Sequence, residues 1–149
     1  MTDTSAQTDD AQTDTDAHVT PITVRFRDLD AMGHVNNAVY ATYVEQARAT
    51  YFREALDLSL DAVRSVIATL TIDYRKPITS GQDVLVRLWI PEIGETSLPM
   101  RYEIVADGEI AAVADSVQVW VDEAGAARPI PDGVRERIRS HPSFEDADT

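Results

Sequence analysis

The chain has 149 residues and a formal net charge of −13 at pH 7. This length fits one domain with a core of ordinary size, and the acidic charge argues against nucleic acid as a partner, because phosphate binding needs a basic surface. The absence of cysteine excludes disulfides, a thiolate nucleophile and a cysteine-bound metal. No apolar run is long enough to span a membrane and the first residues lack the pattern of a signal peptide, so we expect a cytoplasmic protein without a membrane partner.

The basic residues are almost all arginines, since Lys76 is the only lysine among the 13 basic residues. Such a composition is typical of a high-salt cytoplasm, where salt screens the repulsion between acidic groups, and we favour this halophilic interpretation. Acidic tails are the alternative explanation, since residues 1–19 contain five aspartates and neither lysine nor arginine. We expect residues 1–19 to be a disordered acidic tail, residues 20–140 to form one domain, and residues 141–149 to be an acidic C-terminal tail.

The first predicted element is a short strand over residues 23–27, where the sequence TVRFR alternates. A long helix is predicted next, over residues 37–55, with Asn36 or Asn37 suited to cap its N-terminus. Apolar residues recur at helical spacing and form one face of this helix: Tyr40, Val44, Ala47, Tyr51 and Ala55.

The rest of the chain is mostly strand. Period-two alternation and turn residues predict four strands, over residues 66–75, 84–90, 100–106 and 110–122. The Asp107–Gly108 pair predicts a tight hairpin turn, and residues 129–141 predict a short last helix with Asp132 as a possible cap. Successive hairpins make the last four strands antiparallel, so we expect an α+β fold in which the long helix packs on one sheet.

The densest polar chemistry lies at the start of the long helix, in the stretch DLDAMGHVNNAVYATYVEQAR over residues 28–48. Two carboxylates, a histidine and two asparagines come together there. The first backbone N–H groups of a helix have no partner within the helix, and the helix dipole favours negative charge at this end. We therefore expect the chemistry of the protein at this helix N-terminus.

The motif combines Asp-x-Asp with Gly-His-Val-Asn-Asn and a tyrosine, and its residues here are Asp28, Asp30, Gly33, His34, Val35, Asn36, Asn37 and Tyr40. Together with the element order, it resembles the hotdog-fold thioesterases, and most of all the 4-hydroxybenzoyl-CoA thioesterase-like acyl-CoA thioesterases. The plant acyl-ACP thioesterases carry a similar segment. The segments DYRKPITSGQDVLV and ARPIPDGVRERI also resemble the family, so the resemblance covers about residues 20–140.

This resemblance implies a hotdog fold, with a long central helix wrapped by a curved antiparallel sheet of about five strands. It implies hydrolysis of an acyl-CoA thioester to the free acid and CoA, with no metal and no cofactor, coenzyme A being part of the substrate. Two subunits would pair to form the active sites at their interface, in a homodimer or homotetramer. An unpaired sheet edge, which a second subunit would cover, agrees with this expectation.

By resemblance, Asp30 is the catalytic carboxylate, acting as general base on water or as nucleophile. The alternative is a structural role in which Asp30 caps a turn before the helix, and this role suits Asp28 better. The resemblance also implies that the backbone N–H near Asn37 polarises the thioester carbonyl, and Gly33 would allow close backbone approach there.

His34 could orient water or, while neutral, form a hydrogen bond with the thioester carbonyl. A structural role, in which the imidazole is satisfied by the local backbone, is an equal alternative. Asn36 could touch substrate, although capping suits it better. The plant pattern has an asparagine where this chain has Met32, which favours the acyl-CoA group over the plant mechanism.

The remaining candidates concern substrate binding. Tyr40 and Ala68 could line the acyl pocket, and Arg75 and Lys76 could meet the phosphates of coenzyme A. Glu45 and Arg48 are three apart and could pair along the helix, in a structural role.

Two other functions remain open from the sequence: an acyl-ACP thioesterase, and a hotdog protein that binds acyl-CoA without hydrolysing it. A hydratase or dehydratase needs a different histidine and carboxylate arrangement, which the sequence does not contain.

Overall fold

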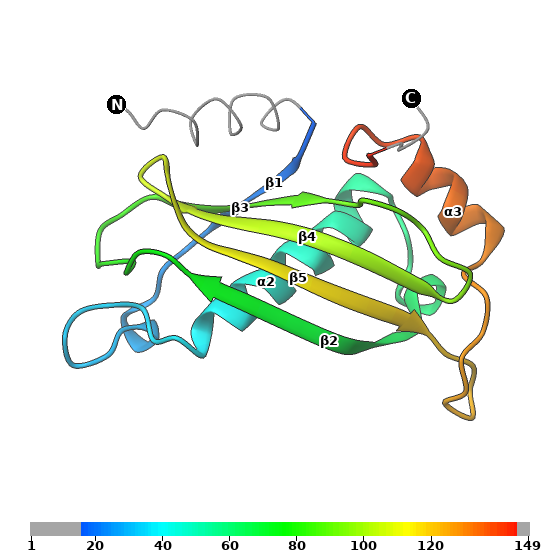
Figure 1. Ribbon diagram of the computed structural model, residues 1–149, viewed down its shortest axis with the longest axis horizontal. Helices are drawn as coiled ribbons and strands as arrows, with labels where there is room; N and C mark the ends of the chain where they lie inside the picture. The colour runs from blue at the N-terminus through cyan, green and yellow to red at the C-terminus, as the bar shows by residue number, and fades with distance from the viewer. Residues whose placement is uncertain (1–15, 146–149) are drawn as a thin grey trace.

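The computed structural model describes residues 16–145, in which a five-stranded antiparallel sheet packs one of its faces against a long helix (Figure 1). The strands are β1 (His18–Ile22), β2 (Ser65–Tyr74), β3 (Val84–Trp89), β4 (Ser97–Ala106) and β5 (Glu109–Trp120). The helices are α2 (Val39–Thr50) and α3 (Asp132–Arg139), with short 3-10 turns at Phe26–Asp28 and Leu60–Val63. The expected α+β architecture, a central helix wrapped by a curved antiparallel sheet, is confirmed.

The strand order β1-β3-β4-β5-β2 differs in one respect from a series of hairpins. β3, β4 and β5 are neighbours as expected, and the turn between the last two has the expected Asp107–Gly108 with positive φ at both residues. However, β2 pairs with β5 and forms one edge of the sheet. The segment after β2 does not form a hairpin because it pairs with the motif loop, where the Val35 N–H donates to the Ile78 carbonyl at 2.8 Å.

The first strand lies earlier than predicted. β1 covers His18–Ile22 and pairs with β3, whereas Phe26–Asp28 forms a 3-10 turn, so the prediction of a strand over residues 23–27 was wrong. The reason is local, because the Asp28 carboxylate accepts the Arg25 N–H at 2.9 Å and so competes with a strand ladder. β1 begins inside the segment predicted as a disordered tail, and residues 1–15 of that tail lie outside the described residues.

α2 begins at Val39, two residues later than predicted, with Ala38 as its N-cap residue. Asn36 stabilises the turn before the helix, since its Oδ1 accepts the Ala38 N–H at 2.8 Å. The helix continues through a π-helical turn over Tyr51–Ala55, so its predicted end is confirmed. Its buried face packs on the sheet and consists of Tyr40, Tyr43, Val44, Ala47 and Tyr51.

β2 is more exposed than the half-buried strand that the alternation predicted. A register shift between Ile67 and Thr69 marks a bulge at Ala68. The inserted residue changes which β2 side chains share one face. The β2 residues that pair with the buried, helix-facing positions of β5 are Ser65, Ile67, Leu70, Ile72 and Tyr74. Val66 is 52% exposed and Tyr74 is 45% exposed, so β2 carries apolar side chains that this chain does not cover.

The C-terminal segment closes one end of the fold. α3 begins with Asp132, and Pro131 rather than Asp132 is its N-cap residue. Residues 141–145, predicted as part of an acidic tail, pack on the domain: the Ser143 hydroxyl donates to the Tyr51 hydroxyl at 3.0 Å and the Glu145 N–H donates to the Ile90 carbonyl at 2.8 Å. Between residues 16 and 145, no helix is long and apolar enough to cross a bilayer.

Candidate active site

The Asp30 side chain is held by the backbone of its own loop. Its Oδ1 accepts the N–H of Met32 at 2.9 Å and the N–H of His34 at 3.1 Å, while its own N–H donates to the His34 carbonyl at 2.7 Å. Among the described residues, no donor contacts its Oδ2. The carboxylate is exposed and therefore fixed in direction while one oxygen stays available for chemistry.

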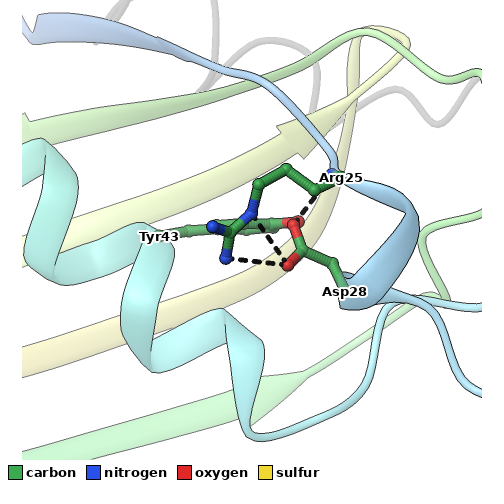
Figure 2. Close-up of polar contacts among 3 residues, drawn as sticks. All are labelled: Arg25, Asp28 and Tyr43. Atoms are coloured by element: carbon green, nitrogen blue, oxygen red, sulfur yellow. Dashed lines mark hydrogen bonds and ion pairs between the residues drawn. The ribbon is translucent and has the colours of Figure 1, made fainter.

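Asp28, two residues earlier, is an internal anchor. Figure 2 shows its carboxylate between the Arg25 backbone and guanidinium and the Tyr43 hydroxyl, which donates to Oδ2 at 2.8 Å. Burial alone would raise the pKa of Asp28, but the hydrogen bonds from the Arg25 N–H, the Tyr43 hydroxyl and the guanidinium outweigh burial and hold the pKa below its ordinary value. The pKa of Tyr43 is raised by burial and by its bond to this carboxylate. Asp28 thus ties the motif loop to α2, as its predicted structural role requires.

The N-terminus of α2 presents a backbone donor to solvent. The Ala38 and Val39 N–H groups donate to Asn36, whereas within residues 16–145 no acceptor takes the N–H of Asn37. The Tyr74 hydroxyl of β2 donates to the Asn37 carbonyl at 2.8 Å and so holds Asn37 against the sheet edge. Free N–H groups at a helix N-terminus attract developing negative charge.

A cavity of about 290 Å³ lies between the motif loop, the helix N-terminus and the end of β2. It brings together the three predicted catalytic residues and three of the predicted binding residues. Its walls are Asp30, His34, Val35, Asn37, Tyr40, Tyr74, Arg75, Lys76 and Pro77. Burial raises the pKa of Tyr40, so the phenol of this residue stays uncharged. Its ring lies edge-on to that of Tyr74, with ring centroids 4.9 Å apart.

Three predicted binding residues do not line this cavity. Ala68 lies exposed at the β2 bulge. Asn36 accepts the Ala38 N–H in the turn before α2, and the prediction that Asn36 or Asn37 caps the helix was wrong, because Ala38 is the N-cap residue. Gly33 has φ +80°, which favours glycine, and no heavy atom of the described chain lies within 4 Å of where its Cβ would stand. Its backbone conformation, rather than crowding within the chain, requires a glycine.

The two predicted phosphate-binding cations are at the cavity mouth and have acidic partners. Arg75 pairs with Asp73 at 3.0 Å, and Lys76 pairs with Glu109. Both cations are about half exposed, so these ion pairs are weak and open to exchange with a bound phosphate.

Tyr74 is the residue that sequence reasoning missed. The alternation of β2 indicated only that Tyr74 shares a face with other apolar residues, and its bond to Asn37 depends on how β2 is placed against the helix. The available signal in the sequence was a tyrosine near the end of a predicted strand, directly before two cations.

Comparisons with known proteins agree with this geometry. Residues 24–138 match the model of a family described as the thioesterase-like superfamily. A Thermus thermophilus structure described as a thioesterase complexed with coenzyme A and Zn is 41% identical, with a TM-score of 0.76, over 82% of this chain and 91% of that chain.

Two relatives are similar in sequence. An acyl-acyl carrier protein thioesterase from Arabidopsis thaliana, ATL3, is 30% identical over 81% of this chain and 67% of its own length. A putative acyl-CoA thioesterase from Bacillus subtilis, YneP, is 28% identical over 68% of this chain and 78% of its own length.

Proposed function

Because the chain belongs to the thioesterase-like superfamily and is a thioester hydrolase, we propose that it hydrolyses an acyl-CoA thioester at the cavity beside Asp30. One observation carries the proposal: Asp30 and Asn37 line the same cavity of about 290 Å³, and the Asn37 N–H has no acceptor within residues 16–145. This pairs a base with a donor for the oxyanion, the two groups that thioester hydrolysis needs.

Asp30 acts through Oδ2, since Oδ1 is engaged by two backbone N–H groups. As a general base it takes a proton from water while the water oxygen attacks the thioester carbon, and it returns that proton to the CoA thiolate when the C–S bond breaks. As a nucleophile it forms a mixed anhydride and releases CoA first, and water then cleaves the anhydride. One turnover in ¹⁸O-labelled water separates the two routes, because only the nucleophilic route can leave the label in Asp30.

The Asn37 N–H stabilises the oxyanion, with the dipole of α2 behind it. Tyr74 positions Asn37 through the carbonyl of this residue, one peptide after the donor N–H. His34, on the cavity wall, orients the attacking water or donates to the carbonyl.

Coenzyme A fits the mouth of the cavity, where Arg75 and Lys76 can exchange their acidic partners for its phosphates. These cations and the coenzyme A held by the Thermus relative favour CoA over acyl carrier protein as the carrier. The proposed chemistry needs no resident metal or cofactor, since a carboxylate and a helix N-terminus supply the base and the oxyanion contact.

The direct test compares Asp30→Asn with wild type in free-thiol release from a panel of acyl-CoAs. Asparagine keeps an oxygen for the two loop N–H groups, so the loop should stay folded while the charge is lost. We expect kcat to fall at least about 100-fold, with an unchanged circular dichroism spectrum. Asp115→Asn, on an exposed part of β5, is the matched control. Activity within a few-fold of wild type in Asp30→Asn would remove Asp30 from the mechanism.

The proposed enzyme is a two-fold homodimer that pairs through β2. This strand is a sheet edge, and Val66, Ile67, Leu70 and Tyr74 all expose more than a third of their surface. An exposed apolar edge invites another strand, and antiparallel pairing with a second copy would extend the sheet and cover these side chains.

Leu70→Arg tests this interface, with Val19→Arg as control, because Val19 is 43% exposed and lies on β1, at the opposite edge of the sheet. In analytical ultracentrifugation we expect the control to keep the wild-type mass and Leu70→Arg to sediment as a monomer. The wild-type mass also separates a dimer from a tetramer. A wild type that is monomeric at assay concentration would exclude the interface.

A further inference from the structure

Two acidic residues, Asp73 and Glu109, lie beside the mouth of the catalytic cavity but are not part of its wall. Asp73 is the last residue but one of β2, and Glu109 is the first residue of β5, directly after the turn that joins β4 to β5. The end of β2 and this turn lie at the same end of the sheet (Figure 1). The proposed thioester chemistry gives neither carboxylate a role.

Both carboxylates pair with cations of the cavity wall. Asp73 Oδ2 accepts hydrogen bonds from Arg75 Nε at 3.2 Å and from Arg75 Nη2 at 3.0 Å. Glu109 pairs in the same way with Lys76. The backbone of the two cations is fixed, because their N–H groups both donate to the Ala111 carbonyl, at 2.8 and 3.0 Å. Each cation therefore lines the cavity while its charge is paired with a carboxylate outside the wall.

These ion pairs are exposed enough for a stronger anion to replace the carboxylate. The side chains of Asp73 and Glu109 are 60% and 64% exposed, and water screens a pair of this kind. Coenzyme A carries a diphosphate and a 3′-phosphate, and a phosphate monoester brings about two negative charges and three acceptor oxygens. A carboxylate brings one charge and two oxygens. Phosphate therefore wins the exchange, but the lost carboxylate contact is subtracted from the affinity for coenzyme A.

The subtraction applies equally to substrate and product. An acyl-CoA and the coenzyme A released from it carry the same phosphates, so cations that held phosphate without competition would also hold the product. Contacts that bind substrate and transition state equally lower KM without raising kcat, and slow product release limits the turnover of many enzymes. Competing carboxylates weaken the grip on the carrier part and leave the contacts at the thioester unchanged.

We propose that Asp73 and Glu109 are specificity-determining counter-ions of the coenzyme A site. Each holds its cation until a phosphate replaces it, and together they set the affinity for the carrier part of substrate and product. The inference rests on the proposed function, through its placement of coenzyme A at this mouth. It gives a protein with a net charge of −13 a charge-balanced mouth that still accepts an anionic substrate.

Asp73→Asn and Glu109→Gln each remove one charge and keep the size of the side chain. The assay compares kcat/KM for an acyl-CoA with kcat/KM for the acyl-pantetheine of the same acyl group, which has the same thioester and no phosphate. We expect this ratio to rise about 3-fold in each variant and about 10-fold in the double variant, which is the range of affinity that exposed ion pairs supply. The inhibition constant of coenzyme A should fall by the same factors.

Glu123→Gln is the matched control, because Glu123 is exposed and follows the far end of β5. It removes the same charge from the chain and should leave the ratio unchanged. The gain of the double variant should shrink between about 0.1 M and 1 M NaCl, over which the Debye length falls from about 10 to 3 Å. A gain that Glu123→Gln reproduces, or that high salt does not reduce, would overturn the local ion-pair account.

The outcomes separate this inference from the proposed function. A lower ratio in Asp73→Asn and Glu109→Gln would show that the carboxylates position the cations for phosphate instead of competing with it, and an unchanged ratio would show that they do neither. Both results refute the inference while thioester hydrolysis stands. A folded wild type that releases no thiol from any acyl-CoA contradicts the proposed function. Calorimetric titration with coenzyme A alone then decides the inference, because tighter binding by the double variant is still expected.

Discussion

Tyr43→Phe removes one hydroxyl and tests the buried anchor of the catalytic loop. Asp28 is 1% exposed and its Oδ2 accepts the Tyr43 hydroxyl at 2.8 Å, so the substitution leaves a buried carboxylate with one partner fewer. The ring and its packing stay, so no cavity forms. A lost bond to a buried charged group costs about 1–3 kcal/mol, which for a domain of this size lowers the midpoint of thermal unfolding by roughly 3 to 10 °C.

The same substitution has a defined pH dependence. The pKa of Asp28 is below its ordinary value, so its ionisation stabilises the fold above the unfolded pKa of about 4, and this contribution is lost as the pH falls through the folded pKa. Without the Tyr43 bond, the folded pKa rises. The difference in unfolding free energy between wild type and Tyr43→Phe should therefore be full at neutral pH and shrink in acid.

Urea unfolding of both proteins over a series of pH values measures this difference. Tyr102→Phe is the matched control, because that buried hydroxyl bonds to Ser116 at 2.7 Å and to no carboxylate, so its cost should not vary between neutral and mildly acidic pH. A Tyr43→Phe cost below about 0.5 kcal/mol, or one independent of pH, would refute the argument that Asp28 is a charged internal anchor.

Three further outcomes are expected. Tyr74→Phe frees the Asn37 carbonyl and should lower kcat of acyl-CoA hydrolysis about 5- to 10-fold, with little change in the midpoint of thermal unfolding. An unchanged kcat would show that Tyr74 does not position Asn37. Burial lowers the pKa of His18 and of His141, and the nearby His141 charge lowers that of His18 further. As the pH falls, these histidines therefore take up protons in the unfolded chain before they do so in the folded protein, and stability should fall below about pH 6.5. Urea unfolding should find a smaller fall in His141→Gln, and an equal fall would exclude this histidine pair as its cause. With a net charge of −13, the thermal midpoint should rise between about 0.1 M and 1 M NaCl, over which the Debye length falls from about 10 to 3 Å, and a flat response would argue against the halophilic interpretation.

Local patterns predicted which residues lie together beside the start of the helix. The helix that ends at Ala55 follows from its apolar face, and the motif sits directly before its first turn, so Asp30, His34 and Asn37 had to lie near one helix end. Sequence neighbours within one loop and one turn stay close whatever the rest of the chain does. This is why six of the predicted site residues line one cavity, whereas their roles in the chemistry stay predictions.

Predictions that depended on distant pairing were less successful. The sequence after β2 contains turn residues, but Ile78 pairs with Val35, which sends β3 to the opposite side of the sheet from β2. The bulge at Ala68 reverses the face of the residues before it, and period-two counting cannot detect an inserted residue.

The two aspartates of the motif show why residue type alone does not assign a role. Asp28 and Asp30 are separated by one residue, yet Asp28 is buried and bonded to Arg25 and Tyr43, whereas Asp30 lines the cavity with one oxygen unbonded among the described residues. In the proposed mechanism this anchor matters for Asp30, because a carboxylate must be held in direction to act on a substrate. The loop would then use the charge of Asp28 for rigidity and the charge of Asp30 for chemistry.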